Sequence, residues 1–153
     1  MRLYTFINFY LSSIQQGIQT AHIMGELVNL SQSPKYDPSK KEQILNWCKN
    51  HKTIVVCNGG NGEGIRNIID LFENPINPYP FAYFYEDCSV DGLLTGVGII
   101  VPEEIYEMKS SFEVINGQRT KIYTYDQPGK VKVILDEYLY QLIDTIKSAP
   151  LAR

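Results

Sequence analysis

An apolar run that leads directly into a helical pattern is the feature that most constrains the fold of this chain. Residues 3–11 are apolar and aromatic, as is typical of a buried strand. The polar side chains that follow share one helical face, with spacings of four, three and four: Gln15, Gln19, His22 and Glu26. Apolar positions flank this polar stripe, with Ile14, Ile18, Ala21, Gly25 and Val28 on one side and Ile23 and Leu27 on the other. Such a stripe indicates a helix, here to about Leu30, that is partly buried or faces a cleft.

The rest of the chain alternates helix and strand signals. Asp37 and Pro38 start a second helix that reaches about Asn50. The remaining predicted elements are a strand (53–57), a Gly-rich turn (58–64), a helix (65–72), strands (81–85 and 94–101), a hairpin around Asn116-Gly117 (111–125) and a helix (128–148). This order predicts one α/β domain over residues 1–153. We expect a two- or three-layer sandwich on a mixed, mostly parallel four-stranded sheet, with an added hairpin and a long C-terminal helix.

Composition excludes several classes of partner. The chain has 153 residues and a formal net charge of −3, whereas nucleic-acid binders usually carry a basic excess or stripe. No segment has the apolar length of a membrane span, and polar residues interrupt the apolar run after Arg2, which favours a buried strand over a signal peptide. Cys48, Cys57 and Cys88 lack metal-ligand spacing and indicate reduced thiols in a cytoplasmic protein. We therefore expect no metal, no cofactor, no nucleic acid and no membrane as partners.

The Gly-rich turn after the strand 53–57 is a candidate ligand site. Backbone amides between a strand and a helix can hold an anion, and Arg66 lies one turn into the helix. Neither the P-loop nor the dinucleotide-binding pattern is present, and Glu63 would repel a phosphate. The turn is thus either a simple connection or a ligand-binding loop. Its candidate binding residues are Asn58, Gly59, Gly60 and Arg66.

Carboxylates and one histidine complete the candidate set. Glu86 and Asp87 follow a predicted strand, where carboxylates are well placed to act as general bases or to orient a polar ligand, although Asp also favours turns for ordinary reasons. Their spacing does not match a calcium loop. His22 is the only histidine of the helical stripe, and imidazole is the side chain type that most often serves as a general base; the residue is either structural or functional. We expect a pocket that joins Glu86, Asp87 and Asn58 to the stripe residues Gln15, Gln19 and His22.

The segment from Leu11 to His22, followed by the strand-helix-strand-acidic turn-strand order, resembles the peptidyl-tRNA hydrolase II family over about residues 3–101. The resemblance implies a small α/β sandwich on a four-stranded mixed sheet, often dimeric. The motif glycine falls on Gly17 and the family's aspartate on Asp87, whereas the motif lysine, glutamine and histidine fall on Ile18, His22 and Gly25. The chain therefore resembles a divergent, phage-type relative.

Since three polar motif positions differ, the expected function is binding of a small polar or nucleotide-like ligand without the esterase activity. One alternative is an active hydrolase of peptidyl-tRNA or another ester that uses His22 and Asp87. The other alternative is a dimeric adaptor that binds protein through the hairpin. A homodimer is expected, because the C-terminal helix carries abundant apolar residues and the hairpin offers edge strands.

Overall fold

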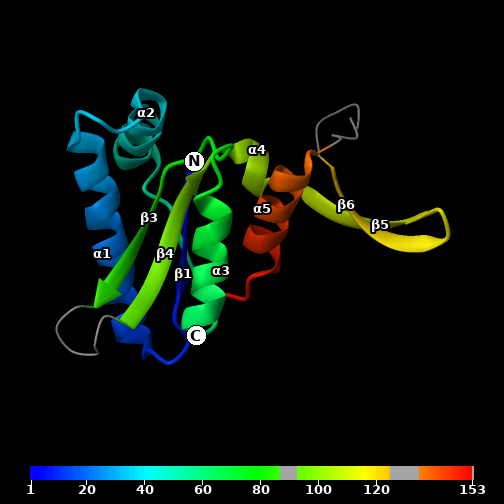
Figure 1. Ribbon diagram of the computed structural model, residues 1–153, viewed down its shortest axis with the longest axis horizontal. Coiled ribbons are helices and arrows are strands. Elements are labelled where there is room, and N and C mark those ends of the chain that lie inside the picture. Colours follow the sequence, from blue (N-terminus) through cyan, green and yellow to red (C-terminus); the bar gives the residue numbers. More distant parts are fainter. Residues whose placement is uncertain (87–92, 125–134, 153) are drawn as a thin grey trace.

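A four-stranded mixed sheet forms the centre of the computed structural model, which describes residues 1–86, 93–124 and 135–152 (Figure 1). Its strands are β1 (Arg2–Ile7), β2 (Ile54–Asn58), β3 (Phe81–Glu86) and β4 (Leu93–Val101), in the order β2-β1-β4-β3. β1 and β2 are parallel, and β4 is antiparallel to both β1 and β3. The predicted mixed sheet is confirmed: β1, β2 and β3 run in one direction, although only one of the three strand pairings is parallel.

Helices cover both faces of the sheet and make the sandwich three-layered. The helical elements are α1 (Ser13–Gln32), α2 (Pro38–Asn46), the π-helical turn η1 (Trp47–His51), α3 (Gly62–Phe72), α4 (Glu103–Tyr106) and α5 (Glu137–Ser148). α1 and α2 lie on one side of the sheet, and α3 and α5 lie on the other (Figure 1). Each side has its own apolar core. Among the described residues, no helix is both long and apolar enough to cross a membrane.

α1 begins at a capping box, and the side that carries Ile23 and Leu27 packs in the core. Ser12 caps the helix by accepting a hydrogen bond from the Gln15 amide, and the Gln15 side chain accepts one from the Ser12 amide in return. Ile23 faces the sheet at two glycines of β4. A Cβ at Gly96 would lie 2.6 Å from Ile7 Cδ1, and one at Gly98 would lie 2.8 Å from Ile23 Cγ2. The small β4 residues therefore let α1 lie close to the sheet and place its polar stripe beside β3.

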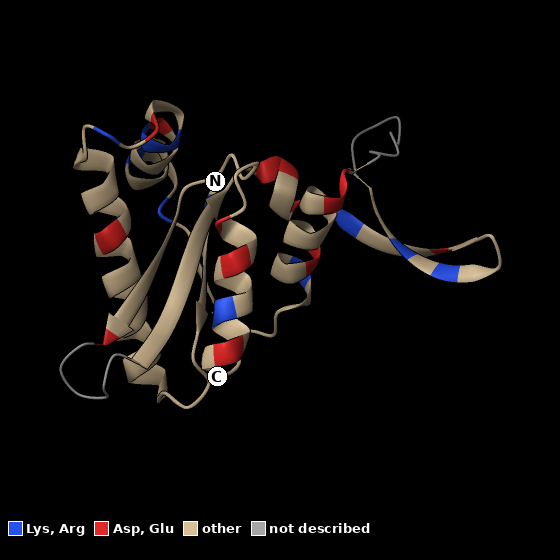
Figure 2. Cartoon of the chain, in the orientation of Figure 1, with Lys and Arg blue, Asp and Glu red and all other residues tan. Residues whose placement is uncertain are grey.

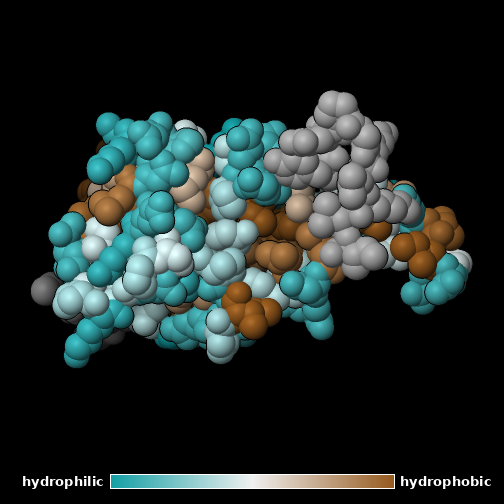
Figure 3. Space-filling view, turned by 90° about the horizontal axis from the view of Figure 1, so that it is seen from above, coloured by the Kyte–Doolittle hydropathy of each residue, from teal (hydrophilic) through white to brown (hydrophobic). Residues whose placement is uncertain are grey.

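The predicted hairpin is confirmed and consists of β5 (Lys109–Ile115) and β6 (Gln118–Thr124). Its turn residues, Asn116 and Gly117, have positive φ angles of 50° and 78°, as hairpin turns of this kind require. The hairpin projects away from the sheet (Figure 1), and apolar side chains gather at its outer end (Figure 3). Exposed apolar residues of the hairpin are Phe112, Val114 and Ile115.

The C-terminal helix differs from its prediction. α5 begins at Glu137, with Asp136 as its cap, because the Asp136 carboxylate accepts a hydrogen bond from the Leu139 amide. Residues 128–134 of the predicted helix lie outside the described residues. Leu142 and Ile143 are fully buried in the core formed with α3. The apolar surplus on which the homodimer prediction rested is therefore used inside the same chain.

The end of the described chain covers the free edge of β2. The Asn58 amide donates to the Pro150 carbonyl at 2.8 Å, and the Ala152 amide donates to the Val56 carbonyl at 2.9 Å. Leu151 forms an antiparallel bridge with Cys57. Backbone pairing of this kind satisfies polar groups that an exposed edge strand would leave open.

Candidate functional site

A cleft of about 230 Å³ lies between the first turns of α1 and the end of β3. Its described lining residues are Leu11, Gln15, Ile18, Gln19, His22, Glu86, Leu93 and Thr95. Four predicted site residues meet here: Gln15, Gln19, His22 and Glu86. The helical stripe and the carboxylate at the strand end, 64 to 71 residues apart in sequence, therefore share one cleft.

A chain of hydrogen bonds orders the polar side chains in this cleft. The Thr95 hydroxyl lies 2.8 Å from Gln19 Oε1 and 3.1 Å from the Phe84 carbonyl oxygen. Gln19 Nε2 donates to Glu86 Oε2 at 2.8 Å. Gln19 and Thr95 are buried, so the amide cannot rotate without losing partners at both ends. The Glu86 carboxylate is consequently held at a defined place in the cleft.

An irregularity in the sheet places Thr95 at this site. The register of β3 on β4 shifts between Phe84 and Tyr85, so that Phe84 pairs with Gly96 and Tyr85 pairs with Leu94. Thr95 is the additional residue on β4. Bulges of this kind redirect a side chain and occur often beside functional sites.

His22 forms the exposed rim of the cleft and stacks on Phe84. The two ring centroids are 4.3 Å apart, and the ring planes differ by 5°. Within the described part of the chain, no hydrogen bond orients either imidazole nitrogen. Stacking on Phe84 is therefore what holds the ring of His22 in place.

The structure separates the Gly-rich turn from this cleft. The amides of Gly59 and Gly60 are already bonded, to the Ile7 carbonyl and to Asn58 Oδ1, each at 2.8 Å. A Cβ at Gly59 would lie 2.9 Å from the backbone carbon of Phe6, so glycine is required there for packing. Asn58 lines a different hollow, of about 350 Å³. The other described residues that line it are Phe9, Gln16, Pro150, Leu151 and Ala152. These contacts support the interpretation of the turn as a connection.

Arg66 also stands apart from the cleft residues described above. The Arg66 guanidinium on α3 lies 5.7 Å from the ring centre of Tyr85, which packs with the core on the α3 side of the sheet. Arg66 is therefore separated from His22 by the sheet. Asp87 lies outside the described residues, so its position relative to His22 stays open.

The sequence reasoning missed two residues that shape the cleft, Phe84 and Thr95. Phe84 precedes Glu86 by two residues, and residues two apart in a strand share one face of the sheet. Having chosen Glu86, the same reasoning could have included Phe84. Thr95 gives no local signal, because its role depends on the bulge and on a partner 76 positions away.

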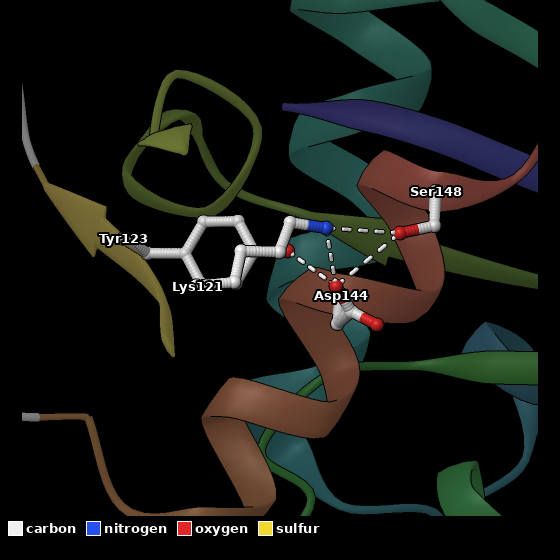
Figure 4. A network of polar contacts seen from close by, with 4 residues as sticks. All are labelled: Lys121, Tyr123, Asp144 and Ser148. Atoms are coloured by element: carbon white, nitrogen blue, oxygen red, sulfur yellow. Dashed lines mark hydrogen bonds and ion pairs between the residues drawn. The ribbon is translucent and has the colours of Figure 1, made fainter. Parts of the chain in front are cut away.

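A second polar cluster joins the hairpin to α5 (Figure 4). Asp144 Oδ1 lies 2.6 Å from both Lys121 Nζ and the Tyr123 hydroxyl, and Ser148 lies 3.2 Å from Lys121 Nζ. The hydrogen bond to Asp144 raises the pKa of Lys121, while burial raises the pKa of Tyr123 to about 12. Lys121 is therefore held as a cation and cannot serve Ser148 as a general base. The cluster ties the hairpin to the body.

The described residues contain neither a metal-ligand cluster nor a reactive thiol at Cys57. They contain no group of three or more His, Cys, Asp or Glu side chains that could hold a metal ion. Burial raises the pKa of the Cys57 thiol to about 11, which keeps it protonated and unreactive at neutral pH. Cys57 is thus a small core residue, and Cys88 lies outside the described residues.

No model of a known protein family matches this chain, and no curated protein matches it. The resemblance to the peptidyl-tRNA hydrolase II family therefore stays a prediction from short motifs. Function has to be inferred from the cleft itself, that is, from its charge, its size and its ordered polar groups.

Proposed function

We propose that the cleft between α1 and β3 binds a small planar ligand with N–H donors, such as a nucleobase or nucleoside, and does not hydrolyse esters. The observation that carries this proposal is the ordered chain from Thr95 through Gln19 to Glu86. It presents a fixed carboxylate beside the stacked rings of His22 and Phe84. A hydrogen-bonding edge next to an aromatic surface suits a flat polar molecule.

Charge supports a ligand without a phosphate group. Among the described lining residues, only Glu86 has an acidic or basic side chain other than the imidazole of His22. A carboxylate accepts hydrogen bonds from N–H groups and repels anions. Of the nucleotide-like ligand expected from the sequence, the charge of the cleft therefore favours the uncharged base or nucleoside without its phosphate.

Size supports a ligand of one ring system. A cleft of about 230 Å³ is smaller than the roughly 300–1,000 Å³ of typical drug-sized sites. The face of the exposed His22 ring that does not contact Phe84 can stack on one planar group. A tRNA acceptor end with its peptide is larger than this cleft and would have to extend beyond the described residues that line it.

An esterase has less support from the same geometry. General-base catalysis needs a base within hydrogen-bond reach of the nucleophile and held in a productive orientation. His22 is held by stacking, and the Thr95 hydroxyl is buried between two acceptors. Neither group is arranged for proton transfer by the residues that the structure describes.

The test combines two measurements on the purified protein. Molecules that co-purify are identified by mass spectrometry after heat release, and a panel of nucleobases, nucleosides and nucleoside monophosphates is screened by thermal unfolding. A ligand at 100 times its Kd stabilises the fold by about 2.7 kcal/mol, which is easily measured as a rise in Tm. We expect a nucleobase or nucleoside to raise Tm more than its monophosphate does.

Two matched variants locate the binding site. Glu86→Gln should abolish the response to the ligand because it removes the fixed carboxylate. Glu104→Gln changes an exposed carboxylate on α4 by the same atoms and should respond like the wild type. Stabilisation by monophosphates alone, or an unchanged response of Glu86→Gln, would overturn the proposal.

A further inference from the structure

The outer face of α1 is apolar, which is the reverse of an ordinary surface helix. Ile23 and Leu27 point into the core, as expected. The opposite face carries Ile14, Ile18 and Val28, which are 77%, 48% and 44% exposed. Solvent-facing helix surfaces are normally polar or charged, and contiguous exposed apolar surface marks an interaction site.

These residues form a regular seam, here named the α1 seam and made of Ile14, Ile18, Ala21, Gly25 and Val28. Their spacings are four, three, four and three, the pattern that lines a helix-helix contact. All five positions are exposed. A Cβ at Gly25 would meet no atom within 4 Å, so packing within the chain does not require glycine in this helix. Because glycine disfavours helix, contact with another helix is a physical reason for its presence.

The seam is complementary in size to itself when two helices run antiparallel. A twofold axis at Ala21 places Ile14 opposite Val28 of the partner subunit, since each lies seven residues from the centre. Ile18 and Gly25 of the partner subunit lie three and four residues from the centre, so they fall within one residue of the same level and the large side chain lies beside the gap left by glycine. A parallel pair would instead place Ile18 against the same residue and leave the two glycines facing each other.

We propose that two copies of this chain form an isologous dimer through the α1 seam, with the two helices antiparallel. Most small homo-oligomers have such twofold symmetry. The proposal is independent of what binds in the cleft, although Ile18 belongs to both surfaces.

Charge distribution favours a second copy as the occupant of the seam. Glu26 is the only charged residue of the 20 in α1, and it lies off the seam. Figure 2 shows the acidic residues concentrated instead on α3, α4 and α5. Two chains of net charge −3 can therefore meet at α1 without opposing carboxylates, whereas a charged partner would find no counter-charge there.

The length of the seam sets the expected strength of the dimer. Fifteen helical residues span about 21 Å, so this helix pair buries less surface than the roughly 1,600 Å² of a standard stable interface. We therefore expect a dissociation constant in the micromolar range, which sedimentation velocity of the full chain can measure across that concentration range.

Gly25→Leu is the decisive variant because stability and dimerisation should change in opposite directions. Leucine favours helix and has open space at this position in the monomer, so the fold should be kept or stabilised. In the dimer it fills the gap that receives Ile18, and the dissociation constant should rise roughly tenfold or more. Asn67→Leu, at an exposed position of α3, is the matched control and should dimerise like the wild type.

Cysteine crosslinking tests the helix direction. A mixture of Ile14→Cys and Val28→Cys proteins should form disulfide-linked heterodimers under mild oxidation, and either variant alone should crosslink far less. The wild type, which retains its own thiols, is the background control. A monomeric wild type at high micromolar concentration, or a Gly25→Leu variant that dimerises normally, would overturn the proposed interface; crosslinking of Ile14→Cys with itself would overturn its direction.

Discussion

The imidazole of His22 lies flat against the ring of Phe84, with centroids 4.3 Å apart and planes 5° from parallel. This contact joins the third turn of α1 to the end of β3. Glu86, two residues beyond Phe84, accepts the hydrogen bond from Gln19 on the preceding turn of the same helix. One strand end and one helix thus contribute both the aromatic surface and the polar edge of the cleft.

The Gly-rich turn should respond to substitution as a packing element. Gly59→Ala places a Cβ 2.9 Å from the backbone of Phe6 and should lower the free energy of unfolding by about 1–3 kcal/mol. Gly62→Ala, in the first turn of α3, meets no atom within 4 Å and should change stability by less than about 1 kcal/mol. Urea unfolding of the two variants checks this difference. Equal stability of both variants would show that a side chain fits at Gly59 and that the turn is not a packing element.

The cluster of Lys121, Tyr123 and Asp144 that ties the hairpin to α5 should make the stability of the protein depend on pH. The hydrogen bond from Lys121 holds the pKa of Asp144 below its ordinary value. A carboxyl with a lowered folded pKa contributes stability that is fully present above the unfolded value of about 3.9 and is lost as pH falls through the folded pKa. Asp144→Asn should therefore destabilise the protein at neutral pH and matter less in acid.

The loss of stability expected for Asp144→Asn is modest, because the Asp144 side chain is 40% exposed and water screens its ion pair with Lys121. We expect a loss of about 1 kcal/mol at neutral pH, measured by urea unfolding, that shrinks below about pH 4. Asp70→Asn, at an exposed position of α3, serves as the control for a general charge effect. A loss that stays constant down to about pH 2.5 would contradict the assignment of this pH dependence to Asp144.

The fold was largely predictable because its signals are local. The capping residues Ser12 and Asp37, the apolar run of β2 and the Asn116-Gly117 turn each act within a few residues. α5 was predicted to start too early because apolar spacing alone does not show where a cap interrupts a helix, and Asp136 provides that cap.

The sequence predicted correctly which site residues meet when those residues belong to one helix, but it was only partly right for residues from different elements. Gln15, Gln19 and His22 share a face, so their meeting follows from helical geometry. The separation of Asn58 and Arg66 from the cleft depends on which side of the sheet α3 covers and on the chain end beside β2. The apolar α1 seam was visible as spacing, but only the structure shows that it faces outward rather than inward.

Binding of tRNA should be weak and sensitive to salt. Among the described residues, basic side chains lie mostly near α2 and on the hairpin, with a further one on α3 (Figure 2), rather than in one stripe. Each phosphate contact releases counterions, so any affinity should fall steeply as salt is raised. Filter binding at low and moderate salt measures this. Tight binding that persists at moderate salt would favour the peptidyl-tRNA hydrolase alternative over the nucleoside proposal.

Substitution of His22 separates a binding protein from a hydrolase. Glutamine can donate or accept one hydrogen bond and present a flat amide to Phe84, but it cannot take up a proton as a base. For a binding protein, His22→Gln should keep most of the affinity for the most stabilising nucleoside of the panel. His22→Ala should lose a contact whose removal costs about 0.5–1.5 kcal/mol, or up to roughly tenfold in Kd. For a hydrolase, both variants should lose turnover of a p-nitrophenyl ester.

We expect the pattern of a binding protein, with no ester hydrolysis by the wild type above the buffer rate. A wild-type rate that disappears in His22→Gln, with the circular dichroism spectrum unchanged, would show instead that His22 is a catalytic base.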